Sequence, residues 1–152
     1  MSQNIVSQIE FEADSINLKV IRNNLRHIFA EYKEDKKNAE DMVVALNEAC
    51  MNIIQHAYSA ERMKELNDES HNTKKILIII EKSDQVWRFE LIDFAPMVDI
   101  KSIKPRDLNE VRPGGLGVSF IQQIMDEVCY ENINNNQYKG NRLILQKKSF
   151  KD

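Results

Sequence analysis

The sequence has little glycine, proline and cysteine, and it has no long hydrophobic run. Its 152 residues include 4 Gly, 3 Pro and 2 Cys. Cys50 and Cys129 lie far apart, and neither has a second metal ligand at a usual spacing. A disulfide scaffold or a zinc site is therefore not expected, and reduced cysteines suit a cytoplasmic protein. The longest apolar run is 76–80, whereas a membrane helix needs about 20 residues. We expect no membrane segment and, because the N-terminus lacks the pattern of a signal peptide, a cytoplasmic location.

An excess of charge of one sign is also missing. Lys and Arg number 21 against 24 Asp and Glu, which gives a net charge of −3. Such a chain has no general attraction to a phosphate polymer, so direct binding to nucleic acid is not expected. The hydrophobic content is 42%, and no repeat, low-complexity tract or Gly/Ser linker divides the sequence. We therefore expect a single domain over residues 1–152.

Hydrophobic periodicity predicts the order strand, helix, helix, strand, strand, lid, helix, strand, strand. The five aliphatic residues at 76–80 favour a strand that is covered on both faces. Segment 94–113 holds all three prolines and little periodicity, which is unusual inside a domain unless the segment is functional. We expect it to form a lid. The expected elements are strands at 5–11, 75–81, 87–92, 129–133 and 142–147, and helices at 16–32, 38–58 and 116–128.

The second predicted helix has a polar face whose side chains could bind a metal ion or take part in catalysis. Glu48 and Asn52 lie four residues apart, about 40° around the helix axis, so both project from one side. An amide oxygen is a hard ligand for Mg²⁺, and a carboxylate can orient or deprotonate an attacking hydroxyl. The alternative is an ordinary solvated face of an amphipathic helix. The spacing alone does not decide between them.

Asp93 ends the second strand of a predicted hairpin. Strict alternation with the large apolar residues of 87–92 places this carboxylate on the apolar side of the strand. A carboxylate in that position needs a donor, and the exocyclic amine of adenine is one. The alternative is a turn acid or helix N-cap just past the strand.

A glycine-rich run, Arg-Pro-Gly-Gly-Leu-Gly at 112–117, immediately precedes the third predicted helix. Unpaired backbone N–H groups at a helix N-terminus attract phosphate oxygens, and Arg112 can add counter-charge. The run matches neither the Walker spacing nor the dinucleotide fingerprint. The alternative is a glycine-rich turn that only lets the chain enter a helix.

Together these segments resemble the three motifs of the GHKL, or histidine-kinase-like, ATP-binding superfamily. The motifs are Glu48 to Asn52 on a helix, Asp93-Phe-Ala-Pro after a strand, and Gly114-Gly-Leu-Gly117 at a helix start. Within the superfamily, segments 52–58 and 125–128 resemble the anti-sigma factor serine kinases of the RsbW and SpoIIAB type. The resemblance implies an α/β fold, an α+β two-layer sandwich. Its mixed, mostly antiparallel sheet is covered by about three helices on one face, and ATP lies between the helices and a lid at about 94–113.

The resemblance also implies roles for single residues. Asn52 would bind Mg²⁺, Glu48 would act as base or orient the substrate serine, and Asp93 would hold the adenine amine. The residues expected to contact the nucleotide are Asn52, Asp93, Ala95, Arg112, Gly114, Gly115, Leu116 and Gly117.

Proteins of this type bind a sigma factor in one state and phosphorylate a serine of a STAS-domain anti-anti-sigma protein in another. Arg22 on the first helix resembles a partner-contact arginine of the family, and a homodimer is possible because family members often dimerise. Two positions depart from the family pattern: Ala95 replaces a glycine, and Asn141 replaces a threonine common in relatives. They leave open the alternative of a nucleotide-binding partner-switch module that sequesters its partner with little or no kinase activity. A histidine-kinase catalytic domain fits less well, because no phosphoacceptor hairpin remains.

Overall fold

The computed structural model describes residues 4–59, 74–97, 115–136 and 139–151. The order of elements is the predicted one. The elements are β1 (Asn4–Glu12), the 3-10 turn η1 (Ser15–Asn17), α1 (Leu18–Glu31), α2 (Lys36–Asn52), the π-helical turn η2 (Ile53–Ala57), β2 (Lys75–Lys82), β3 (Val86–Asp93), α4 (Gly115–Ile124), β4 (Glu127–Asn134) and β5 (Lys139–Lys148). None of these described helices is long and apolar enough to cross a bilayer.

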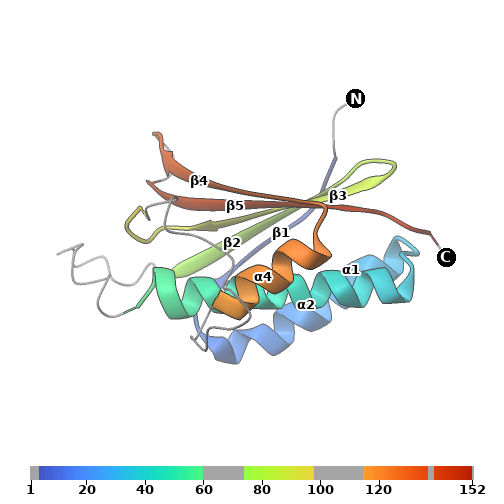
Figure 1. Cartoon of the computed structure of the whole chain (residues 1–152), viewed down its shortest axis with the longest axis horizontal. Coiled ribbons are helices and arrows are strands. Elements are labelled where there is room, and N and C mark those ends of the chain that lie inside the picture. Colours follow the sequence, from blue (N-terminus) through green and yellow to red (C-terminus); the bar gives the residue numbers. More distant parts are fainter. Residues whose placement is uncertain (1–3, 60–73, 98–114, 137–138, 152) are drawn as a thin grey trace.

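The five strands form one sheet in the order β1-β2-β3-β5-β4. Every neighbouring pair in this order is antiparallel, so the sheet expected to be mixed is antiparallel throughout the described strands. Helices α1, α2 and α4 lie on one face of the sheet, which gives the predicted two-layer α+β architecture (Figure 1). Helix α2 contacts both α1 and α4. It is therefore the middle helix of its layer.

The core lies between the helical layer and the inner face of the sheet. The apolar stripe predicted for the second helix is confirmed in the main: its residues in α2 are buried, as are Ile53 and Ala57 in η2, whereas Ile54 is half-buried. Phe29 of α1 meets Trp87 of β3 edge to face, with ring centroids 4.9 Å apart, a preferred aromatic geometry. Burial raises the pKa of the Cys50 thiol to about 12, so Cys50 is an inert core residue. The fully buried large side chains include Leu25, Phe29, Met42, Leu46, Ile76, Ile78, Ile80, Trp87, Phe89 and Leu91.

Three details of the predicted elements are wrong. Ile16 and Val20, expected on the core stripe of the first helix, are 77% and 59% exposed. Ile16 belongs to η1, before the regular helix begins at Leu18. Val128, expected on the third helix, lies in β4 because α4 ends at Ile124. Strand β2 is covered by helices on one face, so its outer aliphatic residues are half-buried.

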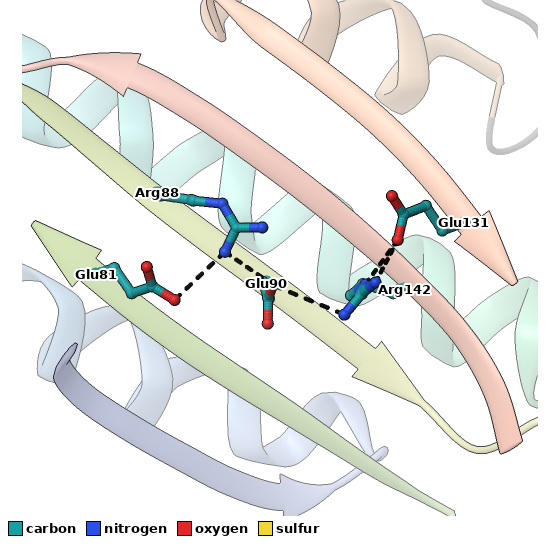
Figure 2. A network of polar contacts seen from close by, with 5 residues as sticks. All are labelled: Glu81, Arg88, Glu90, Glu131 and Arg142. Atoms are coloured by element: carbon teal, nitrogen blue, oxygen red, sulfur yellow. Dashed lines mark hydrogen bonds and ion pairs between the residues drawn. The ribbon is translucent and has the colours of Figure 1, made fainter. Parts of the chain in front are cut away.

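The outer face of the sheet carries a row of charged side chains (Figure 2). Arg88 Nη1 lies 3.3 Å from Glu81 Oε1 and 2.8 Å from Glu90 Oε1. Arg142 Nη1 lies 3.9 Å from Glu90 Oε1, and the Arg142 guanidinium also pairs with Glu131. These five residues come from β2, β3, β5 and β4, one beside the next. Cross-strand ion pairs of alternating sign keep this face polar without a covering helix.

Candidate functional site

The centre of the candidate site is Asp93, the last residue of β3. It is 4% exposed and lies opposite Asn141 of β5. Its Oδ1 accepts hydrogen bonds from Asn141 Nδ2 at 2.9 Å and from the backbone N–H of Ala95 at 3.1 Å. The prediction that this carboxylate lies on the apolar side of the strand is confirmed. Two donors on one oxygen fix the rotation of the carboxylate, and both favour its ionised form.

Gly140 explains how β5 approaches the end of β3 so closely. A Cβ built on Gly140 would lie 2.0 Å from the backbone oxygen of Asp93 and 2.9 Å from Cα of Phe94. Both contacts are with backbone, which cannot move aside as a flexible side chain can. A residue with a side chain at 140 would therefore push β5 away and separate Asn141 from Asp93.

Asn141 joins three segments at this edge of the sheet. It is 8% exposed, and its Nδ2 also donates to the backbone oxygen of Pro96 at 3.1 Å. Its Oδ1 accepts from Asn132 Nδ2 of β4 at 3.1 Å. Because Nδ2 faces a carboxylate and a carbonyl, and Oδ1 faces an amide N–H group, the two ends of the Asn141 amide are distinguished by their partners.

Tyr58 ties the end of the second helical region to the same edge. Its hydroxyl donates to the backbone oxygen of Lys75 at 2.6 Å and accepts from the backbone N–H of Phe94 at 2.7 Å. Burial, together with the negative charge of Asp93, raises the pKa of Tyr58, although the bond from Phe94 N–H opposes this rise. The hydroxyl therefore stays protonated and can bridge η2 to the first residue of β2 and to the residue after β3.

Glu48 and Asn52 lie one turn apart near the end of α2, as predicted. Both residues are half-buried, and their neighbours Ala45 and Ala49 are buried at 0% and 1% exposure. This side of α2 is thus not simply a solvated face. Asn52 Nδ2 is buried and makes no hydrogen bond to the described part of the chain. Buried amide groups are normally paired, so an orphan at this position is a sign of a polar site.

The other predicted residues are only partly within the described structure. Gly115, Leu116 and Gly117 form the first turn of α4, which confirms that the glycine-rich run opens a helix. Arg112, Gly114 and the expected lid beyond residue 97 lie outside the described residues. In Figure 1 the end of α2, the end of β3 and the first turn of α4 lie in the same half of the molecule.

Arg22 lies on α1, apart from these residues. Its Nη1 donates to Asn47 Oδ1 of α2 at 3.0 Å, which turns the guanidinium toward the neighbouring helix.

Sequence reasoning missed the support around Asp93. Asn141 was noted only as a departure from the family pattern, whereas its amide bonds directly to the carboxylate. Tyr58 entered only as part of the family-like segment 52–58, and Asn132 was not singled out, because their partners are backbone atoms or lie across a strand pair. Gly140 gave a weak signal, because it is one of only 4 glycines and lies just before the strand predicted from residue 142.

The residues around this edge fit Mg²⁺ and an adenine nucleotide. Asn52 offers a hard amide oxygen and Glu48 a carboxylate on the same helix face, which are ligand types that Mg²⁺ prefers. Asn52 Nδ2 makes no hydrogen bond within the described residues, so this end of the amide is not held by them. Asp93 offers an oriented acceptor, and the first turn of α4 offers backbone N–H groups.

Comparison with known proteins agrees with this arrangement. Residues 11–147 match the family model described as histidine kinase-like ATPase domain. The serine-protein kinase RsbW of Bacillus licheniformis is 30% identical over 109 residues, which cover 72% of this chain and 67% of that protein. The enzyme of the same name from Staphylococcus aureus strain MSSA476 is 28% identical over 129 residues, 80% of this chain and 76% of that protein.

A solved structure shares the fold. It contains the RsbU and RsbW domains of a Mycobacterium tuberculosis protein, with a TM-score of 0.61 and 17% identity. The match covers 95% of this chain and only 33% of that longer one. The family match and the sequence relatives together show that the chain belongs to the histidine kinase-like (GHKL) ATPase family, as an RsbW-type member.

Proposed function

We propose that this protein is an ATP-dependent anti-sigma factor serine kinase, which binds a sigma factor and phosphorylates a serine of a STAS-domain anti-anti-sigma protein. Family membership supports an ATPase-type domain, and the sequence relatives described above are serine-protein kinases. The observation that favours a kinase is Glu48. It is a half-buried carboxylate one helical turn before Asn52, on the helix face that bears the orphaned amide.

The nucleotide base would meet Asp93. An ionised carboxylate is an acceptor only, so it suits the exocyclic amine of adenine. The phosphates would meet the first turn of α4, where the backbone N–H groups of Gly115 and Gly117 belong to the positive end of the helix. Arg112 would add counter-charge to the phosphates.

Asn52 would hold the magnesium ion through its amide oxygen, with ATP phosphates and water as further ligands. When bound, the ion neutralises charge on the phosphates during transfer. Glu48 would accept the proton of the substrate serine hydroxyl or orient that hydroxyl toward the phosphate. Phosphoryl transfer depends mainly on such positioning and charge stabilisation, which two oxygen-bearing side chains on one rigid helix can supply.

Labelled ATP and a STAS-domain protein test the kinase assignment. We expect Glu48→Gln to slow serine labelling by about 10² to 10⁴-fold, with ATP affinity within about twofold of wild type. Asp41→Asn is the matched control, because Asp41 lies two turns earlier on α2 and forms an ion pair with Lys37 at the surface. Labelling by Glu48→Gln at the wild-type rate would refute the catalytic role of Glu48.

A partner-switch module with little or no kinase activity is the second candidate, because Ala95 and Asn141 depart from the family pattern. Ala95 is 2% exposed, and its backbone N–H donates to Asp93 despite the added methyl group. Asn141 likewise donates to Asp93. Both contacts support a working base site, which either candidate needs. The same experiment separates them, since tight binding of nucleotide and partner without any serine labelling favours the module.

Helix α1 is the proposed docking surface for protein partners. Ile16 and Val20 are exposed one turn apart, and Arg22 lies on the same helix. Exposed apolar residues one turn apart are suited to anchor a protein partner. We expect Ile16→Ser with Val20→Ser to weaken sigma-factor binding at least about tenfold while ATP binding is unchanged. Unchanged sigma-factor affinity in this double variant would exclude α1 as the docking surface.

A further inference from the structure

The side-chain amide of Asn141, next to Asp93, is held by hydrogen bonds at both of its ends. Its Nδ2 donates to Asp93 Oδ1 at 2.9 Å and to the backbone oxygen of Pro96 at 3.1 Å. Its Oδ1 accepts from Asn132 at 3.1 Å. Asp93 and Asn141 are only 4% and 8% exposed. A buried amide with its donor and acceptor ends both engaged cannot turn over without losing several hydrogen bonds at once.

We propose that Asn141, held by Asn132, is a positioning residue that fixes the Asp93 carboxylate and thereby makes the site prefer adenine over a 6-oxo purine. This inference rests on the proposed function, because it takes Asp93 to meet position 6 of the base. What is particular to this chain is that position 141, a threonine in many relatives, carries an asparagine that bonds directly to Asp93 and is held by Asn132. Asn141 acts on the base only through Asp93.

The chemistry of the two purine classes explains the preference. Adenine presents an amine at position 6, which can donate to a carboxylate, whereas hypoxanthine and guanine present a carbonyl oxygen there. Two acceptors facing each other in a buried site repel, and both lose the hydrogen bonds they made to water. Rejection of the carbonyl therefore requires that Asp93 stays ionised and keeps one orientation.

Two hydrogen bonds within the described residues serve both requirements. Asn141 Nδ2 and the Ala95 N–H both donate to Oδ1, which fixes the carboxylate and favours its charged form. The Ala95 donor is backbone and is present whatever residue stands at 95. Asn141 donates through its side chain, so a substitution at position 141 removes this hydrogen bond and tests the proposal.

The test compares ATP with inosine triphosphate, which shares the ribose and phosphates of ATP and carries a carbonyl at position 6. Dissociation constants are measured by calorimetry for wild type, Asn141→Leu, Asn141→Asp and, as matched control, Asn134→Leu, which is an exposed asparagine on the same β4 to β5 hairpin. We expect wild type and the control to bind ATP at least about tenfold more tightly than inosine triphosphate. Asn141→Leu removes one hydrogen bond to a charged group, so ATP binding should weaken about tenfold with little change for inosine triphosphate.

Asn141→Asp should weaken ATP binding further, because it places a second acceptor against Oδ1. Asp93→Asn provides the reverse experiment. With Asn141 donating to its oxygen, the amide at 93 would direct N–H toward the base, and we expect inosine triphosphate to become the preferred ligand. Asn132→Ala changes an exposed side chain, so it should fold normally and reduce the preference for ATP about threefold.

The outcomes separate this inference from the proposed function. If wild type binds neither triphosphate, the proposed function and this inference both fail. If wild type binds ATP and the ratio of the two dissociation constants stays the same in every variant at 141, the inference alone is wrong. A loss of equal size for both triphosphates in Asn141→Leu would also overturn it, because a purely structural asparagine weakens both ligands alike.

Discussion

Two buried carboxylates lie at opposite ends of β3 and are used differently. Glu34 is 5% exposed and Asp93 is 4% exposed, so burial alone does not distinguish them. Glu34 accepts hydrogen bonds at both oxygens: Oε1 from Trp87 Nε1 at 2.7 Å and Ser149 Oγ at 2.5 Å, and Oε2 from Asn38 Nδ2 at 2.8 Å and the Phe150 N–H at 2.6 Å. At Asp93, Oδ1 accepts from Asn141 Nδ2 and from the Ala95 N–H at the end of the strand. The fold thus provides hydrogen-bond donors to both oxygens of Glu34, whereas at Asp93 two donors fix the orientation of the carboxylate through Oδ1.

Around Glu34, hydrogen bonds join the junction between α1 and α2 to the chain that follows β5; we call this region the Glu34 joint. Lys33 there has a positive φ of 56°, which lets the chain turn between α1 and α2. Asp35 caps α2 by accepting from Asn38 N–H at 3.0 Å, and its own N–H donates to the backbone oxygen of Phe150 at 2.6 Å. The helix junction is thereby joined to the chain that follows β5. Glu34 stabilises this joint with no contribution from a ligand.

The end around Asp93 holds features that cost stability in the absence of a ligand. Asn52 Nδ2 is buried without a hydrogen bond to the described residues, and Gly140 brings two backbone segments into close contact. An unpaired buried donor costs about 1–3 kcal/mol. Natural proteins keep such groups where a ligand will use them. The comparison therefore predicts that substitutions at one end change stability and at the other end change nucleotide binding.

Gly140→Ala should have the largest effect and should affect both properties. The new Cβ would lie 2.0 Å from the Asp93 backbone oxygen, so β5 must move away from β3 and take Asn141 with it. We expect the free energy of unfolding to fall by about 3 kcal/mol and ATP affinity to fall at least about tenfold. Urea unfolding and calorimetry measure these changes, with the exposed neighbour Lys139→Ala as control. Wild-type behaviour of Gly140→Ala would show that the strands do not need this close approach.

Glu34→Ala should lower stability by about 2–3 kcal/mol and leave ATP affinity unchanged. It leaves Trp87 Nε1 and Asn38 Nδ2 without this acceptor in a buried environment and frees the chain after β5. The exposed Glu31→Ala on α1 is the matched control and should change the free energy of unfolding by less than about 0.5 kcal/mol. A large loss of ATP affinity in Glu34→Ala would break the proposed separation between the two ends.

The pH dependence of stability tests whether the ionised Glu34 carboxylate stabilises the fold. Burial alone would raise the pKa of Glu34, but the hydrogen bonds to the carboxylate outweigh it and hold the pKa below its usual 4.5. A carboxyl with a lowered pKa in the folded state stabilises the protein above its unfolded pKa, and this contribution is lost as pH falls through the folded pKa. We expect the stability difference between wild type and Glu34→Gln to be constant from pH 7 to about 5 and to shrink below about pH 4.5. A difference that does not change down to pH 3 would exclude this role for the Glu34 charge.

The sequence predicted the elements better than the contacts between them. Periodicity identified the α2 core stripe and the side of β3 on which Asp93 lies, because both depend on local spacing. It failed at Val20, which lies about 200° around α1 from the buried Leu18 and therefore faces away from the sheet. The Glu34 joint left no pattern, because its donors come from residues 38, 87, 149 and 150. The bond from Asn141 to Asp93 joins residues 48 positions apart, which only the strand register specifies.

Asn52→Leu should have the smallest effect on stability, and in the opposite direction to the others. It replaces an amide whose Nδ2 is buried and unpaired within the described structure by an apolar group of similar size, so the ligand-free protein should be unchanged or more stable by up to about 1 kcal/mol. The stabilisation that Mg-ATP gives to wild type in thermal unfolding should disappear, because the proposed metal ligand is gone. The exposed Gln55→Leu, one turn later, is the control and should retain that stabilisation. A clear loss of stability in ligand-free Asn52→Leu would mean that this amide supports the fold, and the contrast with Glu34 would then no longer hold.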